Sequence, residues 1–321
     1  MDIRDRNGMK ILAAERVDNA PQAKKIILLW AGASALLSLA VSLISFLLDS
    51  QIELTGGLSG IGLRSVLTTL QTLLTIASTV LVPFWTLGYT GCTLRFARGQ
   101  DARLRDLAEG FRRFGPALRL MLLRYLLYLG IALLAMNVSS MILSATPFAA
   151  PLYDLLVGSE EQILAGNVSD ELLSAATAAM IPMFIGFLVL FALLVIPLVY
   201  RLRLAELRLM DEPRCGARMA MRESSRLMFR KRFQLFRLDL SFWWYFLAEF
   251  LIAGLCYGDQ LLPLFGVALP IGADLAFFLF YALGLGAQVI LLYFLGNRVQ
   301  TTYAIFYDTL FQPSREQPTQ L

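Results

Sequence analysis

Long apolar stretches alternate with short polar ones along the 321-residue chain. The hydrocarbon layer of a bilayer is about 30 Å thick, and roughly 20 helical residues cross it. A helix satisfies its backbone hydrogen bonds internally, so it is the state expected of such stretches in lipid. Six stretches reach the required length: 26–48, 67–90, 117–143, 179–200, 238–257 and 275–296. The pattern predicts an all-α fold, an integral membrane bundle of six transmembrane helices.

Two of the polar connections combine many basic residues with a helical spacing of apolar ones. In the stretch 94–114, Asp101 is expected to cap a short helix at its N-terminus. The apolar positions that follow it on one face are Leu104, Leu107, Ala108, Phe111 and Phe114. The stretch 217–246 has the same character and runs directly into the fifth apolar stretch. Both are predicted to be cytoplasmic amphipathic helices that lie on the membrane surface.

The positions of Lys and Arg indicate which ends of the six helices face the cytoplasm. All but one of the 28 basic residues, Arg64, lie in the terminal segments, after the second or fourth apolar stretch, or at the start of the third. The loops 146–178 and 258–274 contain none. Short loops rich in Lys and Arg stay in the cytoplasm, so both termini are expected there. The predicted organisation is a cytoplasmic segment 1–25, a membrane domain 26–312 and a cytoplasmic tail 313–321.

Composition narrows the range of functions. The chain is 57% hydrophobic and 16% charged, and it contains no His and only three Cys, which are widely separated. The absence of His excludes the commonest general base and metal ligand, and the Cys spacing matches no metal or redox motif. We therefore expect no catalytic residue, no cofactor and no metal. The net charge of +4 does not indicate a polyanion binder, and we expect no nucleic-acid partner.

One carboxylate lies within an apolar stretch. Glu249 belongs to the fifth stretch, and ionisable groups at membrane depth often have a role in transport or proton transfer. Together with Arg124 and Gln288 it forms a candidate intramembrane polar site. The alternative is structural: Glu249 lies near the outer end of a tilted helix, or pairs with a neighbour such as Gln288.

Several basic residues are candidates for contact with lipid head groups. They are Arg95, Arg98, Arg119, Arg230, Lys231 and Arg232. Anionic lipids attract each basic residue near the surface by about 1 kcal/mol. Arg119 and Arg124 can equally extend to the interface without a specific ligand, because long basic side chains bury their stems and keep their charge in water.

Three parts of the sequence carry a resemblance. The first is LGYTGCTLRFARGQDARLRDLAEGFRRF, with Arg98–Gly99 and Asp106–Leu107. The second has Ile196–Pro197 and then Asp211–Glu212–Pro213, and the third is VQTTYAIFYDTL near the C-terminus. Together these parts resemble an uncharacterised family of multi-pass bacterial membrane proteins of Gram-positive type, described as a domain of unknown function. That family is distantly similar to the membrane domain of some glycerophosphodiester phosphodiesterases.

The resemblance implies a location in the bacterial cytoplasmic membrane and no established activity. We expect a membrane protein without catalytic activity that acts in the cell envelope through contacts with lipid or a partner. The expected partners are the bilayer, its anionic head groups, and a membrane protein or a second copy of the chain. A transporter of a small solute or lipid is the alternative. An enzyme is the third class, disfavoured by the missing His and by the lack of paired carboxylates at membrane depth.

Overall fold

The computed structural model describes residues 5–54, 61–144, 170–264, 266 and 272–316. Throughout these residues the elements are helices, and no strand occurs among them. The chain divides into two compact units, the first formed by Met1–Ala117 with Leu204–Leu321 and the second by Leu118–Arg203. The predicted loop at 146–178 lies largely outside the described residues.

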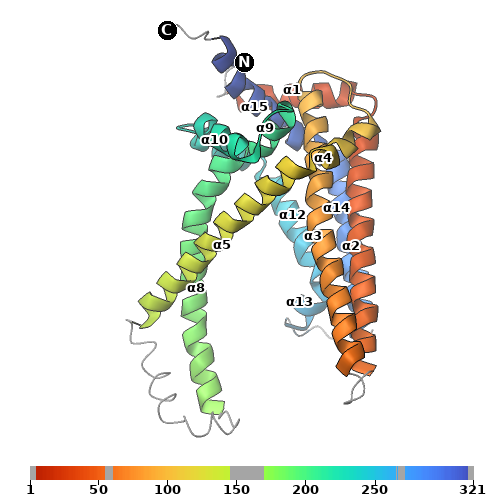
Figure 1. The fold of residues 1–321 in the computed structure, drawn as a ribbon, viewed down its shortest axis with the longest axis vertical. Helices are drawn as coiled ribbons and strands as arrows, with labels where there is room; N and C mark the ends of the chain where they lie inside the picture. Colours follow the sequence, from red (N-terminus) through yellow and green to blue (C-terminus); the bar gives the residue numbers. More distant parts are fainter. Residues whose placement is uncertain (1–4, 55–60, 145–169, 265, 267–271, 317–321) are drawn as a thin grey trace. The chain divides into compact units, whose positions relative to one another are not determined.

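Long apolar helices form one half of the first unit (Figure 1). They are α2 (Ala23–Leu54), α3 (Ile61–Ala97), α12 (Trp243–Cys256) and α14 (Ala273–Leu291). α2 packs on α3 and α14, and α14 packs on α12. At the last contact Gly284 faces Cys256 so closely that a Cβ on Gly284 would collide with the thiol and backbone of Cys256. A glycine is required there because the two helices approach each other closely.

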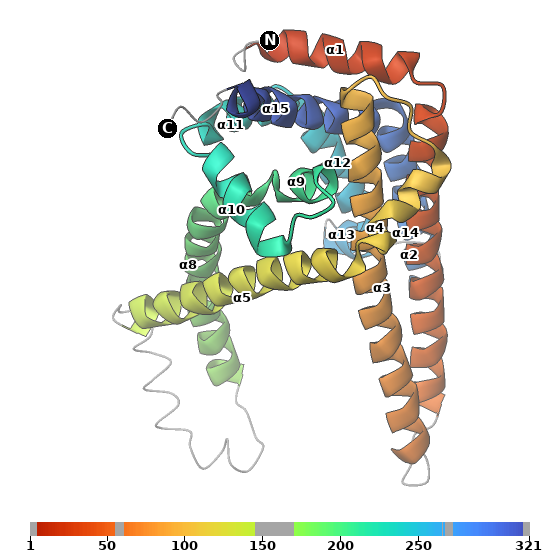
Figure 2. The same ribbon diagram turned by 45° about the horizontal axis from the view of Figure 1, so that its top comes forward.

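Further helices, most of them short, gather at one end of these apolar helices, and we call this part the head. It comprises α1 (Arg6–Asn19), the 3₁₀ helix η2 (Leu104–Ala108), α4 (Glu109–Arg112), α9 (Ala205–Asp211), α10 (Ala217–Leu227), α11 (Arg232–Leu240), α15 (Asn297–Glu316) and the C-terminal end of α3. A π-helical turn, η3 (Leu292–Gly296), joins α14 to α15. Figure 2 shows α1 lying along α15.

The densely packed core of the first unit is in the head. Phe84, Phe96, Leu107, Phe306 and Tyr307 are fully or almost fully buried there. By contrast, at most 17% of the residues are buried in the apolar windows of α2, α3 and α14. A soluble protein rarely exposes apolar surface on this scale. The head therefore has a core of its own, whereas the long helices lack a protein cover over most of their surface.

The second unit consists of α5 (Phe114–Ser144) from Leu118 onward and α8 (Asp170–Leu202). Arg124 Nη2 donates to the carbonyl of Leu202 at 2.6 Å, and Ser139 Oγ donates to the carbonyl of Met183 at 2.7 Å. Most apolar side chains of both helices are exposed. Five described helices are long and apolar enough to cross a membrane, or six if α11 and α12 count as one bent span.

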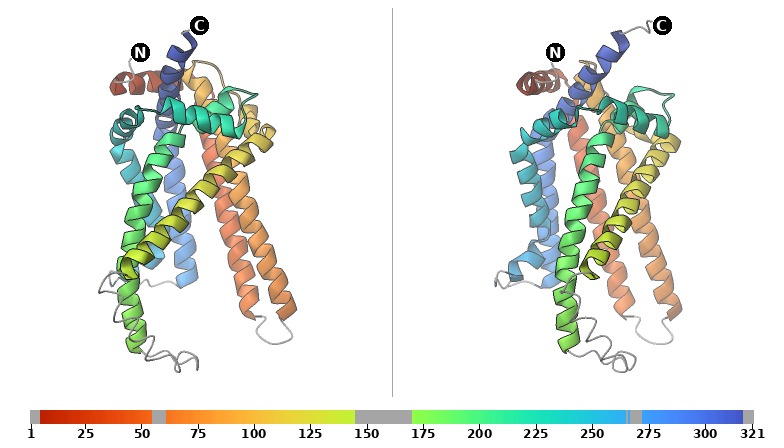
Figure 3. Two further views of the ribbon diagram at one scale, coloured as in Figure 1. Left: turned by 60° about the vertical axis from the view of Figure 1, so that its left-hand side comes forward. Right: turned by 90° about the vertical axis from the view of Figure 1, so that its left-hand side faces the viewer.

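The fifth predicted span differs from the structure. Residues 238–240 belong to α11 and residues 243–256 to α12, and the two helices meet at 68°, so this stretch counts as a span only as part of a bent pair. The remaining predicted stretches coincide with α2, α3, α5, α8 and α14 extended by η3. Figure 3 shows α12 and α14 side by side from two further directions.

The predicted N-cap at Asp101 is also wrong. The turn begins three residues later, as the 3₁₀ helix η2, with Arg103 as its N-cap. The Asp106 carboxylate reaches back and accepts the backbone N–H of Arg103 at 2.7 Å. The acidic side chain of the third helical position thus satisfies the free N–H at the helix start, in the manner of a capping box.

Candidate functional site

Residues from all three parts that carry the family resemblance meet in the head. Arg98 follows the last residue of α3, where Gly99 adopts a φ of 69° and turns the chain. Arg98 Nη1 donates to Asp211 Oδ1 of α9 at 2.6 Å, and Arg98 Nη2 donates to Asp308 Oδ1 of α15 at 2.8 Å. One guanidinium thus joins three elements that are far apart in the sequence, as a planar group with several donors can.

A second arginine, Arg208, extends this arrangement. Its side chain is almost completely buried and forms ion pairs with Asp211, Glu212 and Glu223. Its guanidinium also lies over the ring of Phe311, 4.6 Å from the ring centroid. The ionic cluster, as we call it, consists of Arg98, Arg208, Asp211, Glu212, Glu223, Tyr307 and Asp308. A buried arginine of this kind is stable only because its partners are already in position.

The environment of the ionic cluster fixes its charges. Burial by itself would lower the pKa of Arg98, but hydrogen bonds to Asp308 and Asp211 outweigh it and raise that pKa. Burial would likewise raise the pKa of Asp211, yet the hydrogen bonds from Arg98 and from the Tyr307 hydroxyl, 2.9 Å away, lower it. Both groups therefore stay charged at neutral pH. Fixed charges of this kind suit a structural junction better than a group that exchanges protons.

Two carboxylates pair with arginines within the first basic stretch itself. Arg95 donates to Asp106 at 2.5 Å and to Glu109 at 3.0 Å. Arg113 donates to Glu109 at 3.1 Å and to the carbonyl of Leu209. Arg95 and Arg98, two of the predicted lipid-contact residues, thus have carboxylate partners within the protein.

The remaining predicted lipid-contact residues lie elsewhere. Arg119 is exposed on α5 in the second unit. Arg230 is exposed in the turn between α10 and α11, whereas Lys231 and Arg232 are half-buried beside it. Three consecutive basic residues therefore remain together at the start of α11.

The three members of the predicted intramembrane polar site lie on three different helices. Glu249 accepts a hydrogen bond from the Tyr245 hydroxyl one turn earlier in α12, at 2.7 Å. Gln288 is half-buried on α14, and Arg124 lies on α5, in the second unit. Tyr245 precedes Glu249 by four residues, a spacing that places the two side chains next to each other on a helix. This local signal for a Tyr–Glu pair is absent from the sequence analysis.

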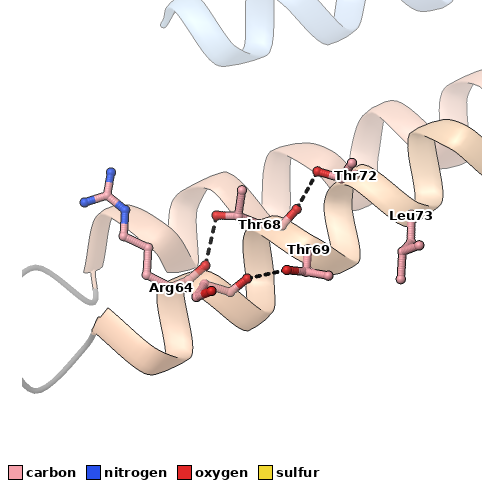
Figure 4. Close-up of a pocket in the computed structure, with 6 residues that line it drawn as sticks. Arg64, Thr68, Thr69, Thr72 and Leu73 are labelled. Atoms are coloured by element: carbon pink, nitrogen blue, oxygen red, sulfur yellow. Dashed lines mark hydrogen bonds between the residues drawn. The ribbon is translucent and has the colours of Figure 1, made fainter.

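One face of α3 carries a row of threonines. Thr68, Thr72, Thr75 and Thr79 are exposed and recur at three- and four-residue spacing, which places them on one side of the helix. Each hydroxyl donates to the carbonyl four residues earlier, as from Thr68 to Arg64 at 2.9 Å. A depression of about 450 Å³ lies at the start of this row, lined by α3 alone (Figure 4).

Sequence reasoning did not find Arg208, Glu223 and Asp308 as members of the ionic cluster. Arg208 and Glu212 are four residues apart, a spacing that indicates an ion pair on one helix. The contacts to Asp308 and Glu223 join separate helices, and one sequence carries no signal for them. Among the described residues, no group of three or more His, Cys, Asp and Glu side chains is arranged to hold a metal ion.

These features define an all-helical protein with long, apolar helices of membrane-crossing length and a packed head joined by an ionic cluster. The chain belongs to the family described as protein of unknown function DUF975, whose model matches residues 14–314. The predicted membership in an uncharacterised family is thereby confirmed. No curated protein and no solved structure matches the chain.

Proposed function

We propose that the chain is a multi-pass protein of the cytoplasmic membrane that has no catalytic activity and acts through contacts of its head with lipid or a partner protein. The distribution of burial is the observation that carries this proposal. The head encloses a packed core, while the apolar windows of the long helices are at most 17% buried. Lipid tails are the environment in which such helices are stable.

The positions of α1 and α15 support an even number of crossings. α1 precedes the first long helix and α15 follows the last, yet the two pack together. Arg298 Nη2 donates to Asp18 Oδ2 at 2.9 Å, and Asn297 Nδ2 donates to the carbonyl of Ala23 at 2.9 Å. A chain whose two ends meet on one side has crossed the membrane an even number of times. Five long helices then require a sixth crossing, for which α12 is the candidate.

The charge distribution supports a cytoplasmic head. Basic residues are concentrated in the segments that build the head, and Arg64 lies at the opposite end of α3. Positively charged segments of moderate length stay in the cytoplasm during insertion. The ionic cluster joins α3, α9, α10 and α15, and we assign it the role of holding the head together.

The test is topological. Epitope tags on either terminus are probed with protease in spheroplasts and in inverted membrane vesicles. We expect cleavage of both tags only in inverted vesicles, and extraction of the chain from membranes only by detergent. Cleavage of either tag in intact spheroplasts, or release of the chain by high salt alone, would overturn the proposal.

A transporter of a small solute or lipid is the second candidate, and the threonine face of α3 favours it. A polar row on an exposed helix face can line an aqueous path, although threonines bonded to their own helix are also tolerated in lipid. The test places Cys at Thr72 or Thr79, with the exposed residues Leu70 and Leu73 as controls, about 100° or more around the helix from Thr72. A path requires faster reaction of the threonine positions with a charged, membrane-impermeant thiol reagent. Equal rates at all four positions would exclude the path.

A further inference from the structure

The helix α11 is apolar on two opposite faces. Leu235 and Leu238 are buried against the protein, whereas Phe233, Phe236 and Leu240 are 67%, 45% and 57% exposed. At 100° per residue these three exposed side chains fall within about 60° of one another, on the side away from both leucines. A helix that is apolar on both faces is normally covered on both. Within the described residues of the first unit, the protein covers the leucine face and leaves the aromatic face exposed.

The leucine face is held in place by α1 and α15. The Tyr303 hydroxyl donates to Asp239 Oδ1 at 2.5 Å. Lys10 Nζ donates to the carbonyl of Ser241 at 2.7 Å, so a cation lies at the C-terminal end of α11, where the helix dipole favours it. The orientation of α11 is thereby fixed, and its aromatic face is presented outward by the fold.

Arginines are interleaved with the exposed rings. The Arg237 guanidinium lies 5.9 Å from the ring centroid of Phe233, and that of Arg230 lies 5.3 Å from that of Phe229. Arg230 has a φ of 60° and is the one described non-glycine residue with positive φ. This conformation costs an arginine roughly 1–2 kcal/mol relative to glycine. The fold keeps Arg230 in this unfavourable backbone conformation although its side chain is exposed. We therefore infer that its positive charge has a function at this position.

The aromatic face continues onto α12. Trp243 and Trp244 are exposed at the start of that helix, directly after the 68° bend. If α12 crosses the membrane near its normal, a helix inclined by 68° lies close to the membrane plane. Tryptophan concentrates at the level of the lipid head groups. Apolar rings, indoles and cations therefore coincide where the head meets the membrane.

We propose that the outer face of α11 is an interfacial anchor that recognises anionic phospholipid in the leaflet beside the head. Phe229, Phe233, Phe236, Leu240, Trp243 and Trp244 insert among the upper acyl chains, and Arg230 and Arg237 bind the lipid phosphates. This inference rests on the proposed membrane location. Interfacial helices combine an apolar face with basic residues in this way.

The first experiment measures the depth of α11 in nanodiscs. The full-length protein carries Cys256→Ala and one labelling cysteine, at Leu240 in α11, Phe250 in α12 or Arg222 in α10; Cys92 and Cys215 are buried. Brominated lipid should quench fluorophores at positions 240 and 250 and leave the one at 222 unaffected. Quenching at 250 without quenching at 240 would overturn the anchor alone and indicate a protein partner for this face. Absence of quenching at both positions would overturn the membrane location as well.

The second experiment measures lipid selectivity with the label at position 240. Quenching by brominated phosphatidylglycerol is compared with quenching by brominated phosphatidylcholine. We expect Arg230→Asn and Arg237→Gln each to reduce the preference for phosphatidylglycerol about fivefold. Asn tolerates positive φ, so Arg230→Asn should not lower thermal stability. Arg105→Gln, at an exposed arginine of η2, is the control and should keep the preference. Unchanged selectivity in both the Arg230→Asn and the Arg237→Gln variant would overturn lipid recognition.

Discussion

The Tyr89 hydroxyl donates to Asn297 Oδ1 at 2.6 Å, joining residues 208 positions apart in the chain. Tyr89 also stacks on Trp30, with the ring centroids 4.3 Å apart. The side-chain amide of Asn297 accepts the Tyr89 hydrogen bond through Oδ1 and donates through Nδ2 to the carbonyl of Ala23. The first residue of α15 is thus bonded to α2 and α3 at the point where the π turn η3 ends. An extra residue in a π turn rotates the side chains that follow it, and here Asn297 occupies the buried position between these helices.

Tyr89→Phe should destabilise the protein by about 1–3 kcal/mol. The substitution keeps the ring stacking but leaves the buried Asn297 oxygen without its donor, which costs the desolvation energy of that group. Thermal unfolding in detergent, followed by tryptophan fluorescence, measures the change. Tyr293→Phe is the matched control, since it removes a half-buried tyrosine hydroxyl of the same π turn. Equal stability of Tyr89→Phe and Tyr293→Phe would contradict the predicted contribution of the Tyr89–Asn297 hydrogen bond.

Arg208→Met should destabilise the head by about 3–5 kcal/mol, because it leaves the buried Asp211 carboxylate with fewer partners. The effect should appear as a lower melting temperature and as faster proteolysis of α9 and α10. If Arg208→Met is as stable as the wild type, the ionic cluster does not hold the head together.

The control for this variant is an ion pair at the surface. Arg298 and Asp18 form a pair with about half of each side chain exposed. Arg298→Gln should therefore cost no more than about 1 kcal/mol. The contrast between the two variants separates the effect of a buried network from that of removing any positive charge.

The Asp211 carboxyl gives the stability of the head a defined acid dependence. Its pKa is lowered in the folded protein, where burial is outweighed by the hydrogen bonds from Arg98 and Tyr307. The folded state then binds fewer protons than the unfolded state at this group. Its stabilisation is fully present above about pH 4 and is lost as the pH falls through the folded pKa. Asp211→Asn should therefore be less stable at neutral pH and lose less stability on acidification, as unfolding at pH 7 and pH 3 can measure. An identical loss in both proteins would contradict the prediction.

The positions of most long helices could be predicted from the sequence, because hydrophobicity over 20 residues is a local property. The bend between Leu240 and Trp243 in the fifth predicted span could not be predicted, because the residues that contact the end of α11 lie far away in the sequence. Lys10 and Tyr303 hold the end of α11, and no residue within 238–257 encodes those partners. α15 was missed for a similar reason: it is polar in part and gains its stability from packing on α1.

The candidate site was less accessible to sequence reasoning. The basic stretch predicts a lipid contact for Arg98 but not its carboxylate partners, since Asp211 and Asp308 lie 113 and 210 positions away. The number of basic residues in a segment predicts on which side of a membrane that segment lies. It does not identify the carboxylates with which one of its arginines forms ion pairs. The family resemblance identified the segments that meet, although not their contacts.

Gly110 in α4 and Gly115 in the first turn of α5 should respond in opposite directions to the same substitution. A Cβ on Gly110 would collide with the carbonyl of Phe84 and the backbone of Gly88, so Gly110→Ala forces α4 away from α3. Overpacking of this kind costs about 1–3 kcal/mol, and backbone atoms have little freedom to yield. Gly115, in the first turn of α5, has nothing within 4 Å of its would-be Cβ. Gly115→Ala should be stabilising by about 0.5–1 kcal/mol, because alanine loses less backbone entropy on folding. Melting temperatures of the two variants in one detergent test the prediction. An unchanged or raised melting temperature of Gly110→Ala would show that the close crossing of α3 and α4 does not constrain position 110.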